Sequence, residues 1–306
     1  AYSYTTSTIC CVSNVLLIYV LAVTQLTHVG PYRYLLLTFA VVDILVSLVH
    51  LLNIPATHMT EFGYIFFSYR FLHDSTAASV WASLSWVALF YQTFVLLAFH
   101  FVYRYVIMCS PGWLAWIQRR PWRNWLIIAL GADVIFVGGI LLTCLFSWTP
   151  NEFTRNVYAP ILKEAYDIDL LGPNKPGYLG IVYWVLNEKG EKEWIMFSLL
   201  IIGWIIILFF SNAALIIFCT FKIIWELNES KVRNLAPATK RLQKQLFTTL
   251  LVQTIVPCLT SYTPMAMLFL VPLTGIGLGG IGTVLIMSTA LFPMLDPYIV
   301  IFLISG

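Results

Sequence analysis

Three carboxylates and one guanidinium stand in or beside long apolar stretches of this sequence. Asp43, Asp133 and Asp296 each interrupt such a stretch, and Arg104 lies near the inner end of 97-LAFHFVYRYVIMCSP-111. A charged group in apolar surroundings is costly unless it is paired or hydrogen-bonded. Where such groups persist, they usually face the inside of a helix bundle and carry function. These groups can form hydrogen bonds and ion pairs, and the function of those bonds depends on the helices that position the groups.

The histidines and cysteines form no catalytic or metal-binding pattern. An intramembrane hydrolase would need paired histidine and acid motifs within its spans. The five histidines are scattered instead, at His28, His50, His58, His73 and His100. The six cysteines lie inside or at the ends of apolar runs, and no CxxC or HExxH spacing occurs. We therefore expect no enzyme activity, no metal and no cofactor.

The composition is that of a protein whose main solvent is lipid. Of the 306 residues, 60% are hydrophobic and 10% are charged, whereas soluble domains average roughly 45–50% and about 25%. The net charge of +3 is small, and no basic surface interleaved with aromatic residues suggests nucleic-acid binding. We expect a lipid bilayer as partner and no nucleic acid. Because the chain opens without a methionine or a signal-peptide pattern, we also expect it to be trimmed at both ends.

Seven stretches are long enough to cross a hydrocarbon core, which needs about 20 apolar residues of helix. They lie near residues 3–26, 33–56, 77–107, 122–146, 194–226, 242–271 and 277–304. The fold class is therefore an all-α membrane protein, a seven-transmembrane helix bundle in a single domain over 1–306. The connectors are short except for 147–193, where 178-YLGIVYWVL-186 predicts a strand that ends at a turn over 187–190.

The basic residues predict which way the chain faces. The gaps after spans one, three and five hold eleven of the 17 lysines and arginines, and most acids lie in the other gaps. Cytoplasmic loops carry the excess of basic residues. We therefore expect the N-terminus and the loop 147–193 outside and the C-terminus in the cytoplasm. The sequon at Asn228 would then lie on the cytoplasmic side, unglycosylated.

Polar residues in three spans lie where they could meet. Asp43 lies mid-span, Asn14 lies at similar depth in span one, and Asp296 with Pro297 lies toward the inner end of span seven. They could form a polar switch cluster that bridges three helices, with Pro297 as a pivot. The alternative is a structural polar cluster without a switching role. Asp133 could serve helix packing or ligand contact.

Three longer motifs resemble one receptor family. They are 99-FHFVYRYVIMCSP-111, 241-RLQKQLFTTLLVQTIVPCLTSYTP-264 and 292-FPMLDPYIVIFLI-304, and they look like the Str family of nematode chemoreceptors, which includes the diacetyl odorant receptor. The resemblance implies an odorant or pheromone receptor that activates the Gα subunit of a heterotrimeric G protein. It also implies a plasma-membrane protein on the cilium of a chemosensory neuron.

The resemblance assigns G-protein coupling to the inner end of span three. Arg104, followed by Tyr105, matches the arginine that closes this span in the wider receptor class, although Tyr103 replaces the acid that usually precedes it. A planar fork of five donors suits hydrogen bonds to the carbonyls of an inserted helix. The inserted helix would occupy a cytoplasmic cleft with Arg104 at its floor. Basic residues at the start of span six would form the wall of this cleft: Lys240, Arg241 and Lys244. Their alternative role is to anchor the chain to anionic lipid heads.

The ligand should bind in the outer half of the bundle. When span three is aligned on Arg104, Trp86, Phe90 and Tyr91 turn inward. Further candidates at comparable depth are His50, Asn53, Phe197, Tyr262, Met265 and Phe269. Such a mostly apolar pocket suits a small volatile or lipid-like ligand, while plain core packing remains the alternative for each aromatic residue.

A ligand-gated channel or transporter is the competing hypothesis for the whole chain. It would need a continuous path of polar residues, and a transporter built from inverted halves would show an internal repeat. The sequence shows neither. A current without added G protein would favour the channel, and nucleotide exchange on purified Gα would favour the receptor.

Overall fold

The computed structural model describes residues 2–23, 32–71, 75–173, 175–228 and 237–305, with the backbone alone for 228, 237–243, 246 and 303–305. Within these residues, seven helices are long and apolar enough to cross a membrane, which confirms the predicted bundle. They are α1 (Tyr2–Val23), α2 (Tyr32–Asn53), α3 (Thr76–Cys109), a fourth span over Pro121–Trp148, α8 (Met196–Asn228), a sixth span over Phe247–Thr274 and a seventh over Ile281–Phe302.

Three of these spans are built from several helical pieces. The fourth joins α5 (Pro121–Asp133) and α6 (Gly139–Thr143), each of which is followed by a π-helical turn. The sixth joins α10 (Pro237–Pro257) to α11 (Thr263–Leu270) through the π-helical turn Cys258–Tyr262, and the seventh consists of α12 (Ile281–Ser288) and α13 (Leu291–Ser305). Proline removes a backbone donor and a π-helical turn adds a residue, so both bend a helix locally.

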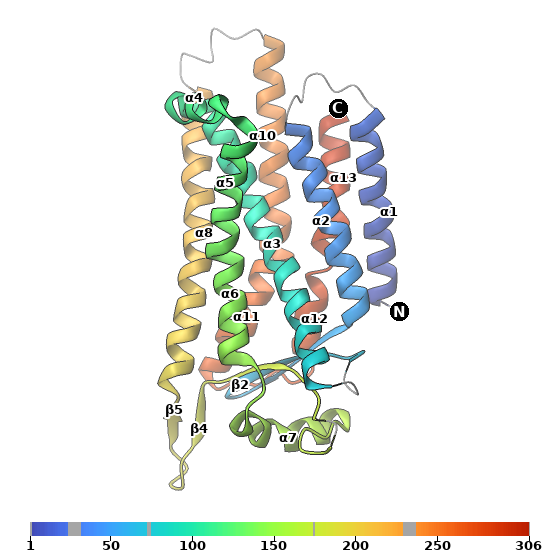
Figure 1. Ribbon diagram of the computed structural model, residues 1–306, viewed down its shortest axis with the longest axis vertical. Helices are drawn as coiled ribbons and strands as arrows, with labels where there is room; N and C mark the ends of the chain where they lie inside the picture. The colour runs from blue at the N-terminus through green and yellow to red at the C-terminus, as the bar shows by residue number, and fades with distance from the viewer. Residues whose placement is uncertain (1, 24–31, 72–74, 174, 229–236, 306) are drawn as a thin grey trace.

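Helix α3 lies in the middle of the bundle. It packs against α2 on one side and α8 on the other, while α1 lies at the edge of the bundle and packs against both α2 and α13 (Figure 1). Ser75 caps the start of α3 by accepting a hydrogen bond from the Ala78 amide. The helix ends before Pro111, which opens the short helix α4 (Pro111–Arg119), because the residue before a proline is disfavoured in helical conformation.

A small antiparallel sheet closes one end of the bundle. It contains β1 (Pro55–Thr60), β2 (Gly63–Ser68) and β3 (Leu179–Val182) in that order, and a separate hairpin pairs β4 (Trp184–Leu186) with β5 (Lys192–Trp194). In the register, Thr60 faces Gly63 and Gly63 faces Val182. The sheet lies at the same end as the start of α1, and the C-terminus lies at the opposite end with α4 (Figure 1).

Helix α7 (Glu152–Tyr166) covers the outer face of this sheet. The hydroxyl of Tyr158, a fully buried residue, lies 2.6 Å from the Ile181 carbonyl and 3.1 Å from the Tyr64 carbonyl. Gly63 is required at this contact, because a Cβ there would lie 2.0 Å from the Ile181 oxygen. The sheet is therefore enclosed between α7 and the bundle. The sheet and α7 together are called the outer cap, after the orientation that the sequence predicts.

The sequence prediction was incomplete at the outer cap. It treated the link after span two as a short connector and missed β1, β2 and α7; it placed a strand over 178–186, which the structure divides between β3 and β4. The strands escaped notice because β2 is buried on both faces, and such a strand lacks the apolar–polar alternation that identifies a one-sided strand. The chain is thus a helical bundle with a minor β component.

Candidate functional site

Helix α3 carries the candidate ligand residues at one end and Arg104 at the other. Its 34 residues correspond to about 50 Å at 1.5 Å per residue. Trp86 and Arg104 both point into the bundle, since both are buried, and their separation along the axis is about 27 Å. One rigid element therefore joins two candidate sites at opposite ends of the protein.

The outer half of α3 presents a stack of aromatic rings. Trp86 and Phe90 lie one helical turn apart and stack with centroids 4.9 Å apart and ring planes 9° from parallel. The Trp86 indole donates a hydrogen bond of 3.3 Å to Nδ1 of His50 on α2. Tyr91 packs edge-on against Phe136 and Phe209. The structure thus brings the predicted residues of α2 and α3 into one apolar cluster with a single polar contact between side chains.

Asn53 lies beside this cluster and links the bundle to the outer cap. Its amide donates a hydrogen bond of 2.6 Å to the Ala82 carbonyl of α3. Its own carbonyl accepts a hydrogen bond of 2.7 Å from the Ser68 hydroxyl of β2. Because its side-chain amide already donates to a backbone carbonyl, Asn53 fits a structural role at the junction of α2, α3 and β2 better than a role in ligand contact.

A small space lies within the outer core, between α3, α11 and the sheet. Its volume is about 20 Å³, which is about the room that one water molecule needs. Residues that the sequence analysis missed supply much of its lining: Tyr64, Phe66, Trp148 and Leu179. The ring of Phe66 lies 5.1 Å from Trp86, and Tyr64 lies 5.7 Å from Phe269. The outer cap therefore packs directly onto the predicted ligand residues.

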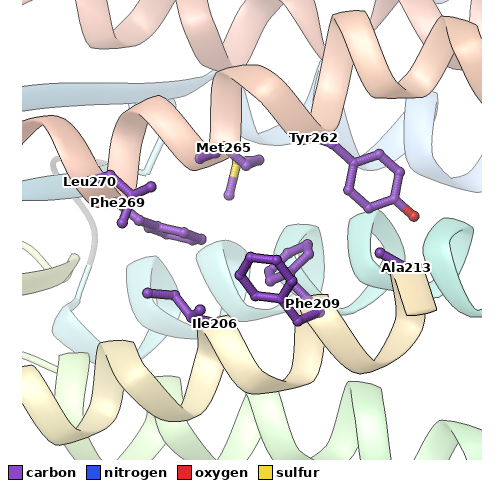
Figure 2. Close-up of a pocket in the computed structure, with 9 residues that line it drawn as sticks. Ile206, Phe209, Ala213, Tyr262, Met265, Phe269 and Leu270 are labelled. Carbon is purple, nitrogen blue, oxygen red and sulfur yellow. The ribbon is translucent and has the colours of Figure 1, made fainter. Parts of the chain in front are cut away.

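A larger pocket lies between α8 and α11. It has a volume of about 440 Å³ and includes Tyr262, Met265 and Phe269, three of the predicted ligand residues. Figure 2 shows these side chains directed toward Ile206, Phe209 and Ala213 of α8. The α8 residues were missed, although positions 206, 209 and 213 recur at the spacing of one helix face. From this span the sequence prediction named only Phe197, on the basis of its depth in the bundle.

Phe197 lies away from both spaces. It is the second residue of α8 and is 63% exposed on the outside of the bundle. The buried positions at this end of α8 are Ser198 and Ile202. Phe197 was chosen by its depth in the span, and depth does not fix the direction of a side chain, because successive helical residues are rotated by about 100°. We remove Phe197 from the candidate ligand residues.

Arg104 is covered by an aromatic residue from α2. The guanidinium carbon lies 4.5 Å from the ring centroid of Tyr32, and Arg104 is only 5% exposed. The Tyr32 hydroxyl is hydrogen-bonded at 3.0 Å to Nδ1 of His100, one turn before Arg104 on α3. Desolvated cation–π contacts are worth about 2 kcal/mol. Tyr32 and His100 escaped the sequence analysis, although the spacing of His100 and Arg104 placed both on one helix face.

The other predicted coupling residues lie around this end of the bundle. Tyr105 packs against Phe218 of α8 with ring centroids 5.6 Å apart. Lys244 of α10 is exposed. The side chains of Lys240 and Arg241 lie outside the described residues. The ring of Tyr32 covers the guanidinium of Arg104 at this end of the bundle.

The predicted polar cluster is divided into two links rather than joined in one. The Asn14 amide donates hydrogen bonds of 3.0 Å to the carbonyls of Cys10 and Pro293, which connects α1 to α13. Asp296 accepts a hydrogen bond of 2.8 Å from Gln253, which connects α13 to α10. Gln253 was missed, although it is a polar residue within an apolar span.

Asp43 lies fully buried near these two links. Neither of its carboxylate oxygens has a hydrogen-bond partner among the residues that the structure describes. Its backbone carbonyl accepts a weak contact of 3.7 Å from the thiol of Cys10. A buried polar group without a partner is costly, which makes Asp43 a position to test by substitution.

Asp133 has a partner that the sequence did not reveal. The amide of Gln92 on α3 donates a hydrogen bond of 2.8 Å to its carboxylate. Of the two roles left open for Asp133, this geometry fits helix packing, because the bond joins α5 to α3.

The seven-helix arrangement and the motifs on it match a known family along the whole chain. The family described as "Serpentine type 7TM GPCR chemoreceptor Str" matches residues 1–306. This chain belongs to the Str family. Such a match over every helix confirms the family that the three motifs suggested.

Known relatives of this Str receptor come from nematodes. It is 27% identical to "Serpentine receptor class r-10" of Caenorhabditis elegans, over 96% of this chain and 84% of that protein. It is 24% identical to "G-protein coupled receptor str-33" of the same organism, over 99% of this chain and 86% of that protein. Squid rhodopsin has a similar fold, with a TM-score of 0.58 at 14% identity over 98% of this chain and 79% of that structure.

The Str receptor departs from the wider receptor class at the position before Arg104. Tyr103 stands in place of the usual acid, and its ring lies 5.7 Å from that of Tyr32. Val300 of span seven is buried with Tyr32 and Leu36 in an apolar cluster. Tyr32 therefore contacts Arg104, Tyr103 and this apolar cluster.

Proposed function

We propose that this Str receptor binds a small, mostly apolar ligand in the outer half of the bundle and activates a heterotrimeric G protein at the end that holds Arg104. The observation that carries the proposal is the position of α3. It joins the Trp86–Phe90 stack to Arg104 in one continuous helix at the centre of the bundle. A shift of its outer half is therefore transmitted to its inner end.

The proposed orientation places the outer cap outside the cell and α4 in the cytoplasm. At the α4 end lie Arg119, Arg120 and Arg123, all exposed. The outer cap carries many acids, and Glu152, Glu164 and Asp167 are among them. This distribution agrees with the excess of basic residues in cytoplasmic loops.

Activation would proceed by a shift between two arrangements of the bundle. A ligand shifts such an equilibrium only by binding one arrangement more tightly. The sixth span is suited to move, because Pro257 and the π-helical turn Cys258–Tyr262 lie between its inner part α10 and its outer part α11. Outward movement of α10, with displacement of Tyr32, would expose the guanidinium of Arg104. Its planar donors could then bond to backbone carbonyls of a Gα helix.

The chemical class of the ligand follows from the side chains in the outer half of the bundle. Aromatic and aliphatic side chains dominate both the outer core and the pocket between α8 and α11, and the polar groups nearby include His50 and the Trp86 indole. Such a site suits an uncharged volatile odorant or pheromone better than an amine. A receptor of this kind would act in the plasma membrane, on the cilium of a chemosensory neuron.

The proposal is tested with a panel of uncharged volatile compounds on cells that express this chain with a Gα subunit. At least one compound should raise nucleotide exchange on Gα in a concentration-dependent manner. Arg104→Ala should reach the cell surface and lose this response, while Arg119→Ala at the same end should retain it. A ligand-evoked current without G protein would instead support the channel, and an unchanged response of Arg104→Ala would remove Arg104 from coupling.

A further inference from the structure

The pocket between α8 and α11 is open to the side of the bundle. Its rim includes Phe210, which is 71% exposed, and Leu270, which is 45% exposed. Ala266 on the same rim is also exposed. Both helices belong to spans apolar enough to cross a membrane. The opening therefore faces the hydrocarbon of the bilayer rather than water.

The lining of this pocket is apolar throughout. Ile206, Phe209 and Met265 present hydrocarbon or thioether groups (Figure 2). The one hydroxyl in the lining, that of Tyr262, donates a long hydrogen bond of 3.4 Å to the Asn212 carbonyl oxygen. An occupant would gain no charged partner here, so the lining selects for uncharged, apolar molecules.

Among the residues that the structure describes, the outer cap lies over the outer core. The Tyr183 hydroxyl donates a hydrogen bond of 3.1 Å to the Phe269 carbonyl. Tyr64 and Trp148 pack on the ring of Phe269 at 5.7 and 6.1 Å. The space of about 20 Å³ between α3, α11 and the sheet is too small for an organic ligand.

Two residues form a common wall between the core and the lateral pocket. Met265 and Phe269 line both spaces. They lie on α11, directly after the π-helical turn Cys258–Tyr262. A molecule in the lateral pocket would therefore press on the side chains that pack the core, next to the point where the sixth span can bend.

We propose that the ligand of this receptor is a bilayer-soluble, uncharged molecule that enters sideways between α8 and α11 and binds against Met265 and Phe269. This inference rests on the proposed receptor function. The pocket volume of about 440 Å³ falls in the usual range of ligand sites, roughly 300–1,000 Å³. At ~30 Å³ per water-sized group it holds on the order of fifteen such groups.

The site is tested by photolabelling of the full chain in phosphatidylcholine nanodiscs, with a neutral medium-chain alkyl diazirine as probe and no G protein present. Labelling of the peptides that contain 206–213 and 262–270 should saturate with probe concentration. Ala213→Trp fills the pocket and should raise the half-saturating concentration at least about tenfold, equivalent to about 1.4 kcal/mol. Ala214→Trp, at an exposed neighbouring position outside the lining, should leave it unchanged.

Two outcomes would overturn the site. The first is labelling that rises in proportion to the probe on all bilayer-facing helices, which indicates lipid contact only. The second is saturable labelling that Ala213→Trp does not weaken. If Ala213→Trp fails to reach the membrane, Ala266→Trp fills the pocket from the opposite wall, with the exposed Met267→Trp as its control.

Signalling separates the failure of this inference from the failure of the proposed function. In the Gα assay, Ala213→Trp should shift the active concentration of an identified ligand, and Ala214→Trp should not. A normal response of Ala213→Trp would overturn the lateral site and leave the receptor function intact. Saturable labelling together with no Gα response to any compound would preserve the pocket but overturn its role as the receptor's ligand site.

Discussion

The outer and inner halves of the bundle are packed in different ways. The outer core consists of interlocking rings and aliphatic side chains, such as Trp86, Phe90 and Phe269. The middle and inner parts hold buried polar groups: Asp43 has no hydrogen-bond partner among the described residues, and the guanidinium of Arg104 lies against an aromatic ring. The outer half is thus close-packed and apolar, whereas the rest of the bundle contains buried polar groups.

This difference indicates where each half should be sensitive. In a close-packed core, a change of even one side chain is felt by its neighbours, because interiors contain few voids. In the inner half, replacement of a polar residue alters how many buried groups have hydrogen-bond partners. Such a change can raise or lower the stability of the bundle, because satisfied buried networks stabilise it and unpaired groups destabilise it. Mutations in the outer half should change ligand response, and mutations in the inner half should change basal activity or stability.

The largest effect is expected from the centre of the outer stack. Trp86→Ala removes a buried ring that contacts Phe90 and Phe66 and that bonds to His50. It should raise the effective ligand concentration for Gα activation at least about tenfold, equivalent to about 1.4 kcal/mol. Trp81→Ala, on the same helix but 64% exposed, is the matched control. If both variants have the same effective ligand concentration, Trp86 has no specific role in the ligand response.

The next effect concerns the ring that covers Arg104. Tyr32→Leu removes the cation–π contact and the hydrogen bond to His100. Basal nucleotide exchange on Gα should rise roughly three- to tenfold without ligand, which corresponds to about 0.7–1.4 kcal/mol, a part of the ~2 kcal/mol that desolvated contacts of this kind contribute. Tyr34→Leu, at an exposed position on the same turn of α2, should leave basal exchange at its normal rate. A fall in basal exchange for Tyr32→Leu would show that the ring supports the active arrangement instead.

A smaller effect is expected at Asp43. Asp43→Asn keeps the shape of a fully buried side chain and replaces a carboxyl group with an amide that cannot ionise. Because ionising a buried carboxyl group costs free energy, the melting temperature of the purified chain should rise by about 2–4 °C. Asp296→Asn is the comparison, since Asp296 already accepts a hydrogen bond from Gln253 and should gain less. A lower melting temperature for Asp43→Asn would mean that the carboxylate is stabilised in the native bundle.

The smallest effect concerns the outer cap and pH. Burial lowers the pKa of His58 below its usual value of 6.5, and Nδ1 of His58 is hydrogen-bonded to the Tyr166 hydroxyl at 3.1 Å. With a folded pKa below the unfolded one, its contribution to stability is present above pH 6.5 and is lost as the pH falls through the folded pKa. Hydrogen-exchange protection of 55–60, corrected for intrinsic rates, should therefore decrease modestly between pH 7.5 and pH 5. His58→Gln should flatten this dependence, and a pH profile that the variant leaves unchanged would exclude His58 as its source.

Much of the bundle could be predicted because the signal was local. Each span is a run of about 20 or more apolar residues, and bilayer thickness alone demands that length. The aromatic pair Trp86 and Phe90 could be assigned to one face of α3 because their spacing equals one helical turn. Arg104 stood out because a cation beside an apolar run is rare.

The failures have equally physical causes. The strand β2 is buried on both faces, so its sequence has no alternation to reveal it. Phe197 was predicted as a ligand residue from its depth. The rotation of α8 about its axis depends on the neighbouring helices, and in the structure this ring is exposed on the outside of the bundle. Tyr32, His100 and Gln253 were missed because each matters through a partner on another helix.

The sequence by itself determined that this protein lies in the membrane as seven helices, that it belongs with the Str receptors, and which charged groups lie inside the bundle. These features follow from hydropathy and from motifs that are continuous along the chain. Only the tertiary structure decided that Tyr32 covers Arg104, that the outer cap closes the core, and that a pocket opens sideways between α8 and α11. Such features depend on the rotation and contact of helices far apart in the chain, which packing sets and no local pattern encodes.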